Sequence, residues 1–205
     1  LDKETKLLKV IAETLYQFSS QVITHTNIRQ QHSIIVEVAG SLSLFGGIEK
    51  LLLAIRQCLQ QLSFHHGEQE PSTGLPHYVA LAKTVKAAEL LARAAAQGRP
   101  NTFGKPSAIT DQFIHIDNAA SESIHALLKP VSVRLLDCAN QHISACDNLG
   151  ITTIGQLYSL PMATLGRRFN KDISLYLKQL DGKDDDPRCL FCLLYTSPSP
   201  RDTEV

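Results

Sequence analysis

Hydrophobic residues recur every three or four positions along residues 3–18, a spacing that predicts an amphipathic helix. Residues 22–24 and 33–38 are rich in β-branched side chains, so we expect two strands there, the second of them buried. Gly40 ends that strand, and the following loop, 41–47, contains a Gly46-Gly47 packing turn. Residues 48–62 predict another helix, which a polar segment, 65–76, breaks.

A further strand and helix follow along the chain. Residues 78–82 predict a central strand, Thr84 is a candidate N-cap, and an alanine-rich helix runs from there to about Gly98. Strands that alternate with helices over short connections predict a small β-sheet with helices packed on it.

Beyond Pro100 the pattern becomes helical. We expect Gly150 to be a left-handed helix cap and Pro161 to lie in a first helical turn. The predicted fold class is therefore α+β, with an all-α part after the sheet. The helices predicted in that part are 118–128, 135–148, 154–159 and 173–180.

The residues around Gly150 have the pattern of a helix-hairpin-helix. Gly150 and Gly155 allow close backbone approach, and the amides near Thr152 can face a phosphate at a helix N-terminus. Such a module binds the DNA backbone without reading its sequence. The alternative is a helical turn that is merely capped by Gly150.

Basic side chains gather just beyond this hairpin. Arg167, Arg168 and Lys171 form the most basic local cluster, and helix-end arginines can contact backbone phosphates. The alternative is a solvated helix end beside the aspartate run at 184–186.

Composition limits the function classes. The 205 residues contain 20 basic and 20 acidic side chains, so the formal charge is zero and bulk positive charge cannot drive DNA binding. The 43% hydrophobic fraction is enough for one sizeable domain or two small ones. No apolar run is long enough for a membrane span, and no signal peptide is visible, so we expect no membrane association.

The five cysteines favour a cytoplasmic protein with free thiols. Their number is odd and their spacing irregular, which suits buried thiols better than disulfides. Cys189-x-x-Cys192 has no second pair, so we predict no metal. His65-His66 with Glu68 and Glu70 is a weaker metal candidate, and a surface loop is the favoured interpretation.

Both ends of the sequence are unusual. Residues 192–202 can be back-translated into the transposase adapter used in preparing sequencing libraries, so we expect a non-native or disordered tail over 189–205 with adapter read-through from Cys192. An ordinary Ser/Pro-rich tail is the alternative. The start at Leu1, inside a helical pattern, leads us to expect a fragment of a longer protein.

Several stretches together resemble the Y-family (DinB/UmuC-like) translesion DNA polymerases, specifically their ImuB-like branch. Val36 to Ser41 followed by Leu44-Phe45-Gly46-Gly47 resembles a palm strand and turn, and residues 79–93 resemble the second palm strand and its helix. Residues 149–169 and 181–188 resemble the helix-hairpin-helix thumb. The resemblance implies a partial palm at 1–105 and a thumb at 106–188, without the fingers, the first palm strand or the little finger.

The chain departs from active members of this family where they hold metal. Counting back from Val38-Ala39-Gly40-Ser41, the expected Asp-Glu pair falls on His32 and Ser33. Neither can replace anionic oxygen ligands for magnesium. Glu37 is the nearest acidic residue, but it lies four and five residues beyond these positions, roughly 13 Å or more along a strand that rises about 3.3 Å per residue. It is therefore too far away to replace the pair. A phosphate-contacting lysine of active members aligns with Val85.

The thumb differs as well. A G-x-G hairpin of active members aligns with Asp137 and Ala139, and we expect Asp137 to repel a phosphate there. The DNA-binding candidates are therefore Gly150, Thr152, Gly155, Arg167, Arg168 and Lys171.

The resemblance implies a non-catalytic adaptor in DNA repair and damage-induced (SOS) mutagenesis. Its expected partners are DNA backbone, bound weakly, an error-prone replicative-type polymerase subunit, a RecA-like accessory protein and the sliding clamp. One alternative is an active translesion polymerase with carboxylates further upstream, and only there do we expect Mg²⁺ as a cofactor. The other alternative is a plain helix-hairpin-helix DNA-binding module.

Overall fold

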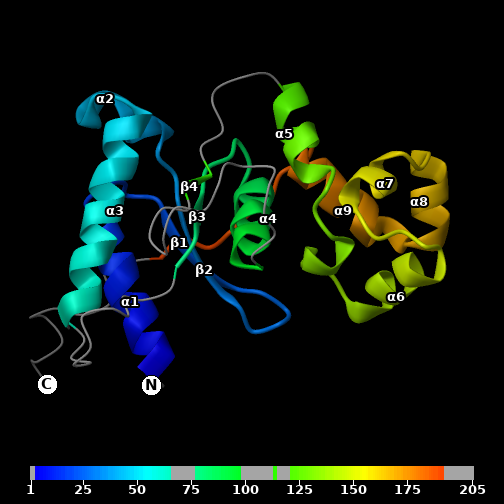
Figure 1. The fold of residues 1–205 in the computed structure, drawn as a ribbon, viewed down its shortest axis with the longest axis horizontal. Helices are drawn as coiled ribbons and strands as arrows, with labels where there is room; N and C mark the ends of the chain where they lie inside the picture. The colour runs from blue at the N-terminus through cyan, green and yellow to red at the C-terminus, as the bar shows by residue number, and fades with distance from the viewer. Residues whose placement is uncertain (1–2, 66–76, 98–112, 115–120, 192–205) are drawn as a thin grey trace, which may run out of the picture. The chain divides into compact units, whose positions relative to one another are not determined.

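The computed structural model describes residues 3–65, 77–97, 113–114 and 121–191 (Figure 1). Helices and two small sheets confirm the predicted α+β class. The chain divides into two compact units. The first is 1–26, 31–76 and 188–205, and the second is 27–30 and 77–187. The predicted palm–thumb boundary at 105/106 and the predicted read-through from Cys192 both lie outside the described residues.

The first unit packs helices against one β-hairpin. Its described elements are α1 (Lys3–Leu15), β1 (Val22–Thr26), β2 (His32–Val36), the 3-10 turn η1 (Ala39–Ser41), α2 (Leu42–Phe45) and α3 (Ile48–His65). The antiparallel register places Val22 opposite Val36 and Thr26 opposite His32. The core of this unit is formed by Ile11, Leu15, Phe18, Leu51 and Ile55.

Two predictions for this unit need correction. The strand predicted at 33–38 runs from 32 to 36, and apart from the exposed His32 its residues are half-buried rather than buried. The loop predicted at 41–47 contains a turn of helix, α2, which ends at Phe45 and is capped by Gly46. Gly46 and Gly47 have φ values of 73° and 109°, a backbone region that residues with a side chain rarely adopt. These two glycines therefore end α2 and allow α3 to begin at once.

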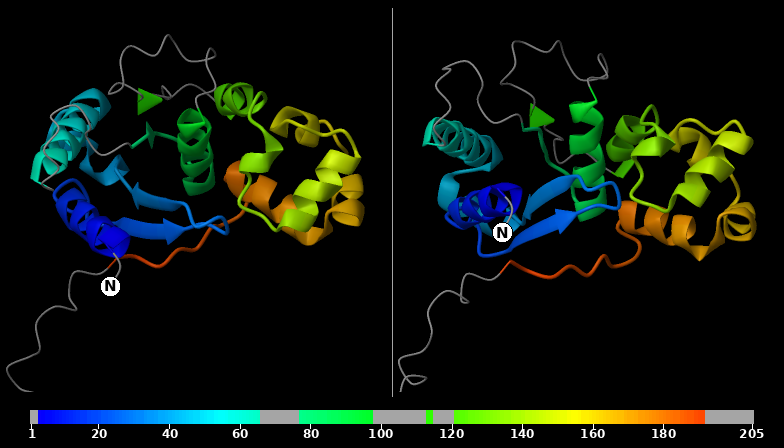
Figure 2. Two further views of the ribbon diagram at one scale, coloured as in Figure 1. Left: turned by 60° about the horizontal axis from the view of Figure 1, so that its bottom comes forward. Right: turned by 90° about the horizontal axis from the view of Figure 1, so that it is seen from below.

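The segment after the second unit returns to the first unit and lies alongside β1 (Figure 2). The Phe191 amide donates to the Val22 carbonyl at 2.7 Å, and the Tyr16 hydroxyl donates to the Phe191 carbonyl. The two rings also lie against each other, with centroids 6.1 Å apart. Because Glu37 pairs with Gln21 on the other side of the strand, the Val22 carbonyl faces the edge of β1 away from β2.

The second unit is mainly helical. Its described elements are β3 (Val79–Ala80), α4 (Val85–Ala96), β4 (Phe113–Ile114), α5 (Ser121–Leu128), the 3-10 turn η2 (Val133–Leu135), α6 (Asn140–Asn148), α7 (Ile154–Tyr158), α8 (Met162–Arg168) and α9 (Asn170–Leu180). One continuous core joins α4 to α5–α9, through Leu90 and Leu91 of α4 and residues such as Leu128, Ile154 and Ile173. The helix α4 thus belongs to the same compact unit as the helices predicted for the thumb.

The helix predicted at 135–148 is wrong in its first part, because α6 begins only at Asn140. Leu136 is extended, with φ −61° and ψ 136°, and follows the short turn η2. Val131, Val133, Leu135 and Leu136 are all buried, so this run of apolar residues is an irregular core segment rather than one face of a helix.

Other boundaries differ by a few residues. The strand predicted at 78–82 is only β3, which pairs in parallel with β4 in a separate two-stranded sheet. The last helix, α9, begins at Asn170 instead of Ile173, and Pro161 is the residue immediately before α8 rather than inside it.

Thr84 is the N-cap of α4, as predicted. Its hydroxyl oxygen accepts from the Ala87 amide at 3.3 Å, and the same hydroxyl donates to the Leu180 carbonyl at 3.0 Å. One side chain therefore satisfies a donor at the start of α4 and an acceptor at the end of α9.

Replacing Thr84 by alanine should lower the free energy of unfolding by about 1–3 kcal/mol, because the change removes both a cap and a second hydrogen bond. Ser41 is the matched control, since it precedes α2 without a side-chain cap bond. Ser41→Ala should change the free energy by less than about 0.5 kcal/mol. Urea unfolding followed by circular dichroism measures both variants, and equal effects would contradict the double role of Thr84.

Candidate functional site

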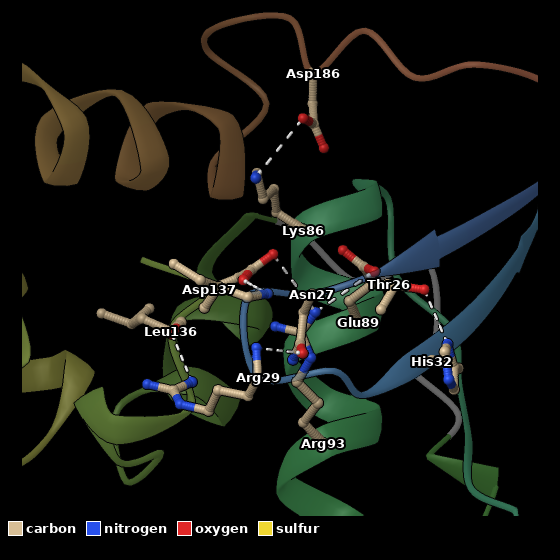
Figure 3. Close-up of polar contacts among 11 residues, drawn as sticks. Thr26, Asn27, Arg29, His32, Lys86, Glu89, Arg93, Leu136, Asp137 and Asp186 are labelled. Carbon is tan, nitrogen blue, oxygen red and sulfur yellow. Dashed lines mark hydrogen bonds and ion pairs between the residues drawn. The ribbon is translucent and has the colours of Figure 1, made fainter. Parts of the chain in front are cut away.

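His32 and Ser33, the two positions expected to carry catalytic carboxylates, begin β2. His32 Nδ1 lies 2.8 Å from the Thr26 hydroxyl across the hairpin, and Nε2 lies 3.6 Å from a carboxylate oxygen of Glu4 (Figure 3 shows the Thr26–His32 pair). Ser33 is opposite His25. Both ring nitrogens of His32 therefore face partners within the first unit.

The carboxylate nearest in sequence is used locally. Glu37 accepts a hydrogen bond from the Ala39 amide at 2.8 Å, which stabilises the turn into η1. In the part of the chain that the structure describes, no three His, Cys, Asp or Glu side chains converge to hold a metal ion. The His66, Glu68 and Glu70 candidates lie outside the described residues.

Val85, the position that aligns with a phosphate-contacting lysine, is followed by a lysine, Lys86, but this lysine already has partners within the fold. Val85 begins α4, and the next residue, Lys86, turns inward. Its ammonium lies 4.7 Å from the centre of the Tyr176 ring. It also lies 3.8 Å from an Asp186 oxygen (Figure 3). Only 14% of this lysine side chain is exposed, so the Lys86 charge interacts with the Tyr176 ring and the Asp186 carboxylate inside the second unit.

The hairpin between α6 and α7 is built as predicted, but its amides are already used. Gly150 has φ 68°, which only glycine adopts without strain, and its amide donates to the Asp147 carbonyl. The amides of Thr152 and Thr153 both donate to the side-chain oxygen of Gln156, at 2.7 and 3.1 Å. This oxygen occupies the place where a phosphate oxygen would bind these two donors.

Gly155 allows a close backbone approach, as predicted, but to Lys129, a partner that the sequence did not identify. Its amide donates to the Lys129 carbonyl at 3.1 Å. A Cβ atom at this position would lie 3.0–3.2 Å from backbone atoms of Lys129. The missing side chain therefore lets α7 approach the end of α5.

The predicted basic cluster is exposed and spans two helices. Arg167 and Arg168 lie in the last turn of α8, and Lys171 lies in the first turn of α9. The positive end of the α9 dipole adds to these three charges. This junction offers an anion more exposed donors than the hairpin does.

Asp137 does not face solvent as an isolated charge. Its carboxylate accepts from the Ile28 amide at 3.0 Å and lies 4.0 Å from the Arg93 guanidinium. Its side chain is 13% exposed. Asp137 therefore has a structural role inside the second unit, and the expectation that it repels a phosphate stays a prediction.

Three of the cysteines have neutral thiols. Burial raises the pKa of Cys138 to about 11, although the nearby Arg29 charge lowers it. Burial also raises the pKa of Cys58 and Cys146. A raised thiol pKa keeps the group protonated near pH 7, so these residues behave as small hydrophobic side chains.

A largely buried acidic residue just after α9 was not predicted as a polar centre. Asp181 accepts a hydrogen bond from the Tyr158 hydroxyl at 2.6 Å and lies 3.5 Å from His125 and 2.9 Å from Lys183. Burial and the Asp181 contact both raise the pKa of Tyr158. The sequence motif Asp181-Gly182 marked this residue, but only the fold shows that His125 of α5 and Tyr158 of α7 contact its carboxylate.

Comparison with known proteins supports the fold. No family model matches the sequence, and no curated protein does. Among solved structures, the chain is similar to the crystal structure of DinB from Sulfolobus solfataricus, with a TM-score of 0.53 and 14% sequence identity. The match covers 89% of this chain and 46% of that chain. The fold is thus that of a part of DinB, in agreement with the Y-family resemblance, and the ImuB-like branch stays a prediction.

No helix among the described residues is long and apolar enough to cross a membrane.

Gly155→Ala tests packing at this site. The new methyl group would meet backbone atoms of Lys129, so the free energy of unfolding should fall by about 1–3 kcal/mol. Gly166 in α8 is the control, because nothing lies within 4 Å of its added Cβ. Gly166→Ala should stabilise by about 0.5–1 kcal/mol through helix propensity. Chemical unfolding distinguishes the two, and an unchanged Gly155→Ala protein would contradict the close approach.

Proposed function

We propose that this chain is part of a non-catalytic Y-family polymerase-like adaptor that acts in DNA repair, translesion synthesis and damage-induced mutagenesis. The observation that carries the proposal is the pairing of a DinB-like fold with His32 and Ser33 at the positions of the expected carboxylates. The chain spans about half the length of DinB, so the activity and partners of the whole protein are proposals.

The chemistry supports a non-catalytic function. Nucleotidyl transfer uses two divalent cations, which carboxylates must hold while they neutralise the triphosphate. His32 is engaged with Thr26 and Glu4, and Glu37 caps a turn. An imidazole and a hydroxyl are poor ligands for magnesium, which prefers anionic oxygen atoms.

DNA contact is proposed at the second unit, through Gly150, Thr152, Gly155, Arg167, Arg168 and Lys171. The three exposed cations supply most of the attraction, because the hairpin amides are bonded internally and DNA must displace Gln156 to reach them. With zero net charge on the chain, we expect binding to be weak, non-sequence-specific and strongly salt-dependent.

The partners implied by the resemblance are an error-prone replicative-type polymerase subunit, a RecA-like accessory protein and the sliding clamp, all in the cytoplasm. A plain helix-hairpin-helix DNA-binding module is the second candidate. It is favoured by the separate hydrophobic core of the second unit, which joins α4 to α9 without residues of the first unit's core.

Primer extension by the full-length protein that contains this chain tests catalysis. With Mg²⁺ and all four nucleotides, incorporation should not exceed that of a preparation without the protein, because the ion-binding carboxylates are replaced. The variant H32A/S33A should behave in the same way. Robust incorporation that this double substitution abolishes would support the active translesion polymerase instead.

The DNA interaction is tested by R167A/R168A/K171A. Binding to a fluorescent duplex should weaken, and the slope of log K against log salt should fall in magnitude by about 0.9 for each phosphate that the variant no longer neutralises. K6A/K9A/K50A removes the same charge from exposed positions of the first unit and is the control. An equal weakening in both variants would show that only overall charge matters.

A further inference from the structure

The β1–β2 hairpin is shared between the two compact units. Its strands belong to the first unit, whereas its turn, residues 27–30, belongs to the second. The chain therefore changes unit twice between Thr26 and Gln31. A turn that joins two paired strands is normally stabilised by those strands, so this division calls for a physical cause.

Residues 135–137 of the second unit hold the turn through two hydrogen bonds. The Ile28 amide donates to a carboxylate oxygen of Asp137 at 3.0 Å, and the Arg29 guanidinium donates to the Leu136 carbonyl at 2.9 Å (Figure 3). Asn27 is 2% exposed, and its side-chain oxygen accepts from the Arg29 amide at 2.9 Å. The turn is thus bonded on its second-unit side, with Asn27 buried, whereas the Ile28 side chain is 57% exposed.

Asp137 is itself fixed by a buried charge cluster. The Arg93 guanidinium lies 3.5 Å from Glu89, one turn earlier in α4, and 4.0 Å from Asp137. The Arg93 and Glu89 side chains are only 7% and 3% exposed. Within the described residues, the three guanidinium nitrogens of Arg93 have no hydrogen-bond partner, so its charge depends on these two carboxylates.

The turn carries strain that must be offset. Gln30 has φ 60°, and a residue with a side chain costs about 1–3 kcal/mol when it is held in this region. Glycine would relieve the strain, but none is present in the turn. Besides the bonds within the turn, in which the Gln30 amide donates to the Asn27 carbonyl at 3.0 Å, the contacts with Asp137 and Leu136 are interactions that can offset this cost.

We infer that the turn 27–30 folds and opens with the second unit rather than with the strands that it joins, through the contact of Ile28 with the Glu89–Arg93–Asp137 cluster. The start of β2, with His32 and Ser33, is therefore sensitive to the stability of the α4–α9 core.

Amide hydrogen exchange measured by NMR on the whole chain tests the inference. Leu90→Ala opens a cavity in the core of the second unit, and Leu51→Ala does the same in the first, both at fully buried leucines. Exchange at the Ile28 amide should accelerate at least tenfold in Leu90→Ala, together with amides of α4. In Leu51→Ala it should stay within twofold, while amides of β1 accelerate.

A second pair of variants tests the contact itself, and it remains informative if a leucine variant fails to fold. Asp137→Ala should accelerate Ile28 exchange at least tenfold and speed trypsin cleavage after Arg29. Asp137→Asn keeps an acceptor for the Ile28 amide and should have a smaller effect. Asp147→Ala, which breaks the more exposed pair with Arg134 at 3.0 Å, is the control and should leave Ile28 exchange within twofold.

The outcomes are decisive in both directions. Two outcomes would show that the turn opens with its strands and that the inference is wrong. In one, Ile28 exchange accelerates in Leu51→Ala together with the amides of β1. In the other, Ile28 exchange accelerates equally in Leu51→Ala and Leu90→Ala. If Asp137→Ala leaves Ile28 protected, the cluster does not hold the turn.

Discussion

One buried positive charge organises the second unit. Arg93 sits in the α4 face that packs toward the core, and its burial is tolerable only because Glu89 and Asp137 carry two negative charges beside it. Asp137 also accepts a hydrogen bond from the Ile28 amide. The same cluster of charges therefore holds in place both the irregular segment before α6 and the strained turn 27–30. Removing Asp137 would leave Arg93 with Glu89 alone and would take the acceptor from the Ile28 amide, so helix, segment and turn depend on each other.

Polar groups at the positions singled out in the sequence are paired within the fold. A polar group that is removed from water needs a partner inside the protein, and three of these groups have one. His32 meets Thr26, Lys86 meets Tyr176 and Asp186, and the Gln156 oxygen meets two hairpin amides. Each of these polar groups contributes to the stability of the fold through its partner.

Local chemistry was predictable from the sequence where a single residue determines it. Thr84 as a cap and Gly150 as a left-handed residue follow from their own stereochemistry, and the α+β class follows from the hydrophobic pattern. The helix predicted from Leu135 was wrong, because consecutive buried residues satisfy a helical period even in an extended segment. The Arg93 cluster and the Asp181 contacts could not be predicted, since their members are brought together only by tertiary packing.

The return of Phe191 to Val22 also bears on how the molecule is made. During synthesis, β1 leaves the ribosome more than a hundred residues before the segment that pairs with its outer edge. At roughly 5–20 residues per second this edge waits for many seconds, long enough for helices and whole cores to form. The later-made helical unit can therefore be complete before the earlier one is closed, and the outer edge of β1 is open to pairing with other chains in the meantime.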